Sequence, residues 1–172
     1  MTPLATLTSP GSRAASLDLV AGTLALNFTN TSSGRGTDQH LEHLRQAGDL
    51  VAWAQHAGLL TLDERAGARP LLADAAAAGG LLRAALTLRE VVYRVFLALS
   101  RQRQPDAADL QALSLTRAAT LARARLLAKS DGSYAWRWTA GEGLAEATLG
   151  PLALSALALL QGRDSARVKQ CS

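Results

Sequence analysis

A regular repeat of apolar residues in the middle of the chain constrains its fold more than any other sequence feature. The repeat has spacings of four and three and consists of Leu81, Ala85, Leu88, Val92, Val95 and Leu99. This is the period of a helix with one buried face. The spacing therefore predicts a helix over Leu81–Arg101, long enough to serve as the spine of the fold.

A polar stripe occupies the other side of this predicted helix. Its members are Arg83, Thr87, Glu90, Arg94 and Arg101. Glu90 and Arg94 are four residues apart, which is the spacing of an ion pair along a helix. We expect the stripe to face water.

Capping residues mark three further helices. Asp49 is a good N-cap for a helix over Leu50–His56, which Gly58 would end. Asp106, after Pro105, can cap a helix from Ala107 to about Thr120. Pro151 suits the first turn of a last helix, which ends by Gly162.

Two stretches alternate with a period of two, as half-buried strands do. Residues 24–29 predict a strand, and the Gly-rich stretch Ser32–Asp38 after it predicts a mobile loop. Residues 122–128 and 134–139 alternate on either side of Asp131-Gly132, which predicts a hairpin. The expected fold class is α+β: a mainly helical single domain with a small antiparallel β-sheet, made of the N-terminal strand and this hairpin.

Length and composition are those of a single globular domain. The chain has 172 residues, 18 basic and 14 acidic side chains, and a net charge of +4, which is too little for a dedicated nucleic-acid surface. We expect residues 1–16 to be a disordered tail, 17–162 the domain, and 163–172 a basic exit segment. The single cysteine, Cys171, indicates a reducing cytoplasmic location. No stretch is expected to span a membrane.

No catalytic or metal-binding motif is complete. His40 and His43 could share a helical face, but His56 is distant and Glu42 and Arg45 are interspersed, which favours a solvated helix start over a metal site. The stretch Ser32–Thr37 lacks the spacing of a phosphate-binding loop. The thiol has no evident base partner, and a Gly-x-Ser-x-Gly elbow is missing. The chain is therefore not expected to be an enzyme.

Arg89 is the most informative residue, because it lies among apolar neighbours on the predicted spine helix. A buried guanidinium must be paired or hydrogen-bonded. An internal ion pair satisfies that need, and so does a pocket in which Arg89 binds an anionic ligand. Asn27 and Asn30 could line such a pocket or bond to backbone groups, and backbone capping is favoured.

Three tryptophans stand out in a chain with few aromatic residues. Trp53 is expected in the core. Trp136 and Trp138 share one face of a predicted strand, where they either cover the helices or line a cleft beside them.

Several segments together resemble one known family. They are residues 24–31 (LALNFTNT), 49–60 (DLVAWAQHAGLL), 88–93 (LREVVY), Trp136-Arg137-Trp138, the helix around 151–160 and RVKQC at 167–171. In this order they are similar to the ABATE domain, the N-terminal part of the CGNR zinc-finger family. The likeness covers nearly everything after the tail.

The resemblance implies a stress-induced transcription regulator whose ABATE domain senses a signal and whose C-terminal zinc finger binds DNA. Cys171 matches the first cysteine of that finger. One cysteine cannot hold zinc, so Cys171 is expected to be a metal ligand only in a protein that carries the finger, and no cofactor is expected in this chain. Where the pattern predicts Leu-Asn after Pro105, this chain has Leu113-Ser114, so its ligand preference can differ.

The expected function is therefore that of a ligand-sensing or interaction domain that controls an attached finger. The candidate ligand-binding residues are Asn27, Asn30, Arg89, Tyr93 and Trp138. The expected partners are an unidentified small molecule, with an anion favoured, DNA through the missing finger only, and a second copy in a homodimer. The alternatives are a small cytoplasmic hydrolase or transferase with a cleft arginine, using a side chain from Asp38–His43, and a structural oligomerisation module.

Overall fold

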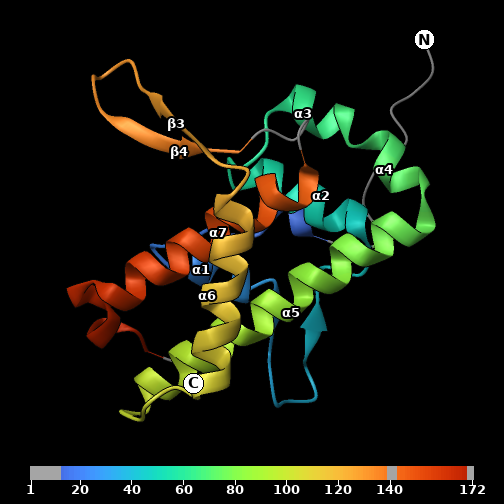
Figure 1. Ribbon diagram of the computed structural model, residues 1–172. Coiled ribbons are helices and arrows are strands. Elements are labelled where there is room, and N and C mark those ends of the chain that lie inside the picture. The colour runs from blue at the N-terminus through green and yellow to red at the C-terminus, as the bar shows by residue number, and fades with distance from the viewer. Residues whose placement is uncertain (1–12, 139–142, 170–172) are drawn as a thin grey trace.

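A long central helix, α5 (Ala75–Ser100), crosses the molecule, and the other helices pack around it (Figure 1). The computed structural model describes residues 13–138 and 143–169. The other α-helices are α1 (Leu24–Thr29), α2 (Ala47–His56), α3 (Leu62–Gly67), α4 (Arg69–Ala73), α6 (Ala107–Leu121) and α7 (Leu144–Gln161). Two 3-10 turns, η1 (Ala14–Ser16) and η2 (Arg163–Arg167), lie near the two ends of the described chain.

Two small antiparallel hairpins complete the fold. One pairs β1 (Ser32–Ser33) with β2 (Leu41–Glu42), and the other pairs β3 (Arg125–Ala128) with β4 (Tyr134–Arg137). Figure 1 shows the β3–β4 hairpin standing off from the helices on one side and the β1–β2 hairpin on another. The α+β prediction is confirmed, because the chain is mainly helical with two two-stranded sheets.

The core lies where α1, α2 and α7 meet α5. Trp53 and Phe28 are fully buried, and their ring centroids are 5.1 Å apart. The expectation that Trp53 lies in the core is confirmed. The other large, fully buried apolar side chains are Leu44, Leu50, Leu113, Leu152, Val51, Val92 and Val95.

The predicted spine helix is confirmed, but it begins at Ala75 rather than at Leu81. Asp74 caps it by accepting hydrogen bonds from the N–H groups of Ala76 and Ala77. The apolar period did not reveal this first part, because small residues fill it. The helix ends in a Schellman motif, in which Gln102 adopts φ +55° and the Arg103 N–H bonds to the Ala98 carbonyl at 2.9 Å.

Two other helices begin earlier than predicted, and one agrees closely. Helix α6 agrees, with Asp106 as its cap. Helix α2 begins at Ala47, so Asp49 lies inside its first turn, where its carboxylate accepts hydrogen bonds from the N–H groups of Arg45 and Gln46.

Helix α7 begins at Leu144, which leaves Pro151 inside it. Its apolar residues bury against α1, α5 and α6, and this packing outweighs the backbone hydrogen bond that proline cannot make. Among the described residues α7 is long and apolar enough to cross a membrane, contrary to the sequence prediction; half of it is buried within the fold. The segment α3–α4 and helix α5 together would also be long and apolar enough, but the chain bends by 116° between them.

The predicted N-terminal strand over residues 24–29 is wrong, because these residues form α1. Thr23 caps the helix by accepting from the Leu26 N–H, and Ala25, Phe28 and Thr29 form its buried face. Those three positions have helical spacing. In a window of six residues, helical and alternating patterns overlap, and packing against α5 and α7 decides between them.

The remaining sequence predictions meet mixed outcomes. The hairpin around Asp131-Gly132 is confirmed, with Gly132 at φ +80° in its turn. Its first strand was predicted from residue 122 but begins at Arg125, because Ala122 caps the end of α6; Thr139 lies outside the described residues. The stretch Ser32–Asp38, predicted as a mobile loop, includes β1 and most of the β1–β2 turn. Ala14–Ser16, placed in the tail, form η1, and Ala14 is buried against α2. Residues 1–12 lie outside the described part of the chain.

Candidate functional site

The β1–β2 hairpin lies over α5 and places charged side chains above it. Its tight turn requires glycine at position 34, where φ is +63° and an added Cβ would lie 2.5 Å from the Gln39 carbonyl oxygen. The hairpin thereby presents Arg35 in its turn and Glu42 in β2 toward the middle of α5.

Arg89 is buried under this hairpin and is fully engaged. Its side chain is only 4 % exposed. The guanidinium donates to both carboxylate oxygens of Glu42, at 2.7 and 2.5 Å, and to Glu90 at 3.1 Å. It also donates to the Thr31 hydroxyl at 3.1 Å. Of the two interpretations of Arg89, the internal ion pair is confirmed.

A second arginine extends the cluster along α5. Arg35 donates to both carboxylate oxygens of Glu90, at 2.6 and 3.0 Å. Its guanidinium also lies 4.2 Å from the centre of the Tyr93 ring, a cation–π distance. Two arginines and two glutamates thus alternate in what we call the Arg89 cluster (Arg35, Glu42, Arg89 and Glu90).

Charge pairing favours the ionised forms of Glu42, Glu90 and Arg89 in spite of burial. Burial opposes ionisation of Glu42 and Glu90, but hydrogen bonds and charge from Arg89 and Arg35 hold the pKa of each carboxyl below its ordinary value. Burial likewise opposes the charge of Arg89, and its two glutamate partners raise its pKa. The cluster has no net charge, and its ion pairs hold the β1–β2 hairpin against α5.

The structure brings only some of the predicted site residues together. Arg89 and Tyr93 lie one turn apart on α5, where Arg35 links them through Glu90 and the Tyr93 ring. Asn27 is nearly buried and its side-chain oxygen accepts from the Ala21 N–H at 2.9 Å, which is the backbone capping that was favoured. Asn30 is exposed at the end of α1.

Trp138 lies apart from this cluster, between α6 and α7. Its indole N–H donates to the Thr120 carbonyl at 2.7 Å, and its ring lies directly over Gly150. It therefore covers the helical layer, whereas Trp136 is 39 % exposed. Arg117 lies about 6 Å from both rings, at 6.0 and 5.9 Å. Cys171, the expected ligand of a finger, lies outside the described residues.

The three histidines are separated into different contacts. His40 and His43 each contact a serine across the β1–β2 hairpin, Ser32 at 2.9 Å and Ser33 at 3.2 Å. The expected helix start around them is wrong, because Leu41–Glu42 form a strand. His56 bonds to the Leu17 carbonyl. Within residues 13–138 and 143–169, no three His, Cys, Asp or Glu side chains are grouped to hold a metal.

Sequence reasoning missed the partners of Arg89. Glu42 lies 47 positions before Arg89, and Arg35 lies 55 before Glu90. No local spacing links residues so far apart. The predicted Glu90–Arg94 pair does not form, because Glu90 bonds to Arg35 and Arg89 while Arg94 bonds to Asp109 at 2.6 Å.

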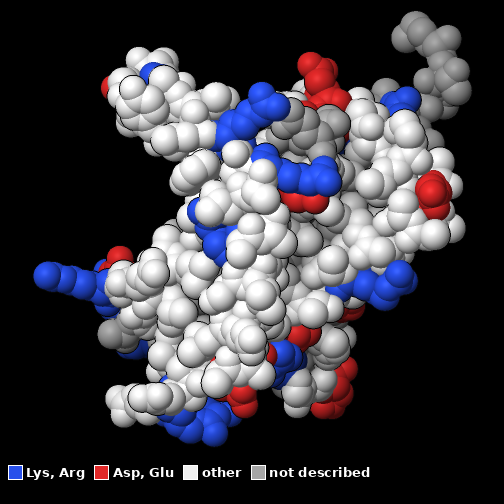
Figure 2. Space-filling model, in the orientation of Figure 1, with Lys and Arg blue, Asp and Glu red and all other residues white. Residues whose placement is uncertain are grey.

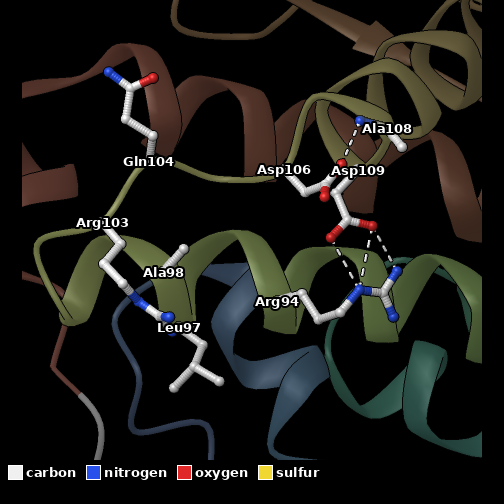
Figure 3. Close-up of a pocket in the computed structure, with 8 residues that line it drawn as sticks. All are labelled: Arg94, Leu97, Ala98, Arg103, Gln104, Asp106, Ala108 and Asp109. Atoms are coloured by element: carbon white, nitrogen blue, oxygen red, sulfur yellow. Dashed lines mark hydrogen bonds and ion pairs between the residues drawn. The ribbon is translucent and has the colours of Figure 1, made fainter.

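A hollow of about 490 Å³ lies at the corner between α5 and α6. Figure 3 shows the Arg94–Asp109 ion pair across one part of it and Arg103 and Gln104 of the connecting segment at another. The charge of Arg94 is balanced there by its ion-pair partner Asp109. Hydrogen bonding from Arg94 lowers the pKa of the Asp109 carboxyl, against the opposing effect of burial. No local pattern indicated this hollow, whose lining includes Arg103 and Gln104 just after the left-handed residue Gln102.

Comparison with known proteins identifies the family. Residues 22–163 match the family model ABATE, described as "Putative stress-induced transcription regulator". The match covers the fold from α1 to the start of η2 and includes the Arg89 cluster. No curated protein and no solved structure matches the chain. The family is one of transcription regulators and is not a known enzyme family. The chain therefore belongs to the ABATE family of stress-induced transcription regulators.

Proposed function

We propose that this domain binds a small anionic ligand and thereby controls an attached DNA-binding zinc finger that begins at Cys171, in the cytoplasm. The observation that carries the proposal is the path of the exit segment. The turn η2 packs against both α5 and α7, and Val168 is partly buried against the core. The exit segment therefore starts from a turn that packs on the helix that carries the Arg89 cluster.

Arg89 supplies the sensing element in this proposal. Its guanidinium is a good receptor for a carboxylate or phosphate, and in the closed structure Glu42 occupies that position with the matching two-point geometry. An anion can take the place of Glu42 only if the β1–β2 hairpin lifts from α5. Ligand binding would then favour the open hairpin, and a ligand acts on a second site only by such a preference.

Of the five residues proposed from the sequence, Arg89 and Tyr93 suit this ligand site best. They share one face of α5 beneath Arg35. Asn27 and Trp138 would contribute only in an arrangement that differs from the closed one, because both already bond to backbone groups; Asn30 is exposed at the end of α1. The hollow beside Arg94 and Arg103 is a second place where an anion could bind.

A thermal-shift screen tests the sensing part. Phosphate and small mono- and dicarboxylates are added to the wild-type chain, to Glu42→Gln and to Arg89→Met. The Glu42→Gln change weakens the side chain that competes with an added anion for Arg89. We therefore expect a stabilising anion to act on the Glu42→Gln variant at lower concentration than on the wild-type chain, and to have no effect on Arg89→Met. Equal stabilisation of all three proteins would overturn the Arg89 site and direct attention to Arg94→Gln and Arg103→Gln.

The control of a finger is tested with the full-length gene product. We expect it to contain zinc, to lose that zinc in Cys171→Ser, and to change its affinity for DNA when the anion found above is added. A ligand-insensitive DNA affinity would contradict regulation while leaving anion binding at Arg89 intact.

A second candidate, a small hydrolase, has one observation in its favour. Ser32 and His40 are within hydrogen-bond distance, as a nucleophile and its base must be. Hydrolysis of an activated ester by the wild-type chain, abolished in both Ser32→Ala and His40→Gln, would support this candidate. If these variants keep the same background rate, the serine–histidine contact only joins the two strands.

A further inference from the structure

The β3–β4 hairpin forms an arm that projects from the helical body and exposes apolar side chains. Leu126, Leu127, Tyr134 and Trp136 are 54, 48, 68 and 39 % exposed. In Figure 2 the middle of this arm, which projects from the helices as in Figure 1, is mostly free of charged groups; the arginines of its two strands, Arg125 and Arg137, lie at its base. A lone two-stranded hairpin is only marginally stable in water, and adjacent exposed apolar side chains mark interaction sites.

The register places the aromatic side chains on one face of the arm. Trp136 is paired with Leu126, and Tyr134 with Ala128, so these four side chains point to the same side. The other face carries the pair Leu127 and Ala135. A partner strand added to β4 would extend both faces.

The outer edge of β4 offers backbone groups to such a strand. The Lys129 N–H bonds to the Ser133 carbonyl at 2.7 Å. Inward and outward pairs alternate along an antiparallel ladder, so Ala135 bonds toward β3 while the N–H and C=O of Tyr134 and Trp136 point outward. Exposed groups of this kind are a template for another strand.

We propose that the outer edge of β4 binds β4 of a second copy, antiparallel, about a two-fold axis at Ala135. Tyr134 of each copy then lies opposite Trp136 of the other, and the outward N–H and C=O groups of both residues become paired. A register centred on Trp136 would require Trp138 in the ladder, but Trp138 is buried between α6 and α7. Registers centred between residues would set the aromatic face of one copy beside the opposite face of the other.

Charge at the two ends of the arm fits this arrangement. The register sets Arg137, at the base of one arm, opposite Ser133 of the other. Asp131 lies beside Ser133 and accepts hydrogen bonds from its N–H and hydroxyl, at 2.9 and 2.6 Å. The two-fold axis therefore places an arginine at the base of one arm near a carboxylate at the tip of the other, twice. Across this seam Arg137 meets Ser133 rather than a like charge, whereas within its own hairpin it is paired with Arg125. The interface does not depend on the ligand proposed above.

Cysteine crosslinking tests the register. In a Cys171→Ser background, Ala135→Cys places two thiols at the axis, where opposite Cα atoms of a non-hydrogen-bonded pair are about 4.5 Å apart. We expect this variant to form a disulfide-linked dimer under mild oxidation. Leu127→Cys is the matched control: it lies directly across the same hairpin, but its two copies would be about 14 Å apart across three strand spacings. Equal crosslinking of both, or of neither, overturns the proposal.

Sedimentation of the uncrosslinked chain tests the association itself. The wild-type mass should move from 18.0 kDa toward twice that value as concentration rises. Trp136→Lys should weaken the association by about tenfold or more, because it removes both aromatic pairs, while Leu127→Lys adds the same charge away from the seam and should weaken it far less. Circular dichroism shows whether each variant is folded. A wild-type chain that stays monomeric to about 1 mM, or that binds DNA through the arm without a change in its own mass, overturns the proposal.

Discussion

Arg89 of α5 and Glu42 of β2 form a bidentate ion pair in which the arginine side chain is almost completely buried and the glutamate side chain is one-third exposed. Removal of Glu42 would leave a buried cation with only Glu90 and Thr31 as partners, whereas removal of Arg89 would leave a carboxylate that water can reach. We therefore expect Glu42→Met to lower the free energy of unfolding by about 3 kcal/mol, and Arg89→Met by less. Urea denaturation of both variants measures the difference.

The double variant is the control for that interpretation. Glu42→Met/Arg89→Met removes both charges, so it should cost clearly less than the sum of the single changes. Strict additivity would mean that the two side chains do not interact energetically.

The Arg89 cluster also predicts loss of stability in acid. Its arginines hold the pKa of Glu42 and of Glu90 below the ordinary 4.5 against the effect of burial. The unfolded chain then binds protons at higher pH than the folded chain, so this stabilisation is complete above about pH 5 and is lost as pH falls through the lowered values. Urea midpoints between pH 3 and pH 6 should show the loss, and Glu42→Gln/Glu90→Gln should show a smaller pH dependence. An unchanged slope in that variant would contradict the assignment.

His43 predicts a second loss of stability at a higher pH. The side chain is 2 % exposed, and burial, with Arg13, Arg45 and Arg89 nearby, lowers its pKa below 6.5, against the opposing charge of Glu42. Protonation therefore favours the unfolded chain, and stability should fall as pH decreases below about 6.5. His43→Gln should abolish the slope between pH 7 and pH 5.5 measured by urea unfolding. His56→Gln, at an exposed position, is the matched control and should retain that slope.

Most helices could be predicted from the local sequence. The ends of several helices and the ion pairs of the Arg89 cluster could not. The period from Leu81 to Leu99 and the cap at Asp106 act within a few residues, and the corresponding helices were found. Residues 24–29 were assigned to a strand, because in so short a window packing against α5 and α7 decides the structure. The need of Arg89 for a partner followed from its apolar neighbours. The identity of that partner, Glu42, depends on a hairpin that no local pattern indicated.

Gly150 in α7 is predicted to be essential for the packing of Trp138. A Cβ at this position would lie 2.5 Å from an indole carbon, well inside van der Waals contact. Alanine normally stabilises a helix interior relative to glycine by up to about 1 kcal/mol. Here we expect Gly150→Ala to destabilise the chain by about 1–3 kcal/mol, because the indole must move and strain its hydrogen bond to Thr120. Gly80→Ala in α5 is the control, since a Cβ there meets nothing within 4 Å and should stabilise the fold.

Gln102 ends α5 in a left-handed conformation that glycine would adopt at lower cost. Its φ is +55°, and its N–H bonds to the Leu99 carbonyl while that of Arg103 bonds to Ala98, both at 2.9 Å. These bonds hold the turn from which Arg103 and Gln104 reach the hollow between α5 and α6. Because a side chain in this region costs about 1 kcal/mol, and glycine gives up about half of that in chain entropy, Gln102→Gly should raise the melting temperature by about one degree. Gln102→Val should lower it, since a β-branched residue tolerates this conformation least. If both substitutions shift the melting temperature in the same direction, the backbone conformation of Gln102 does not limit the stability of this corner.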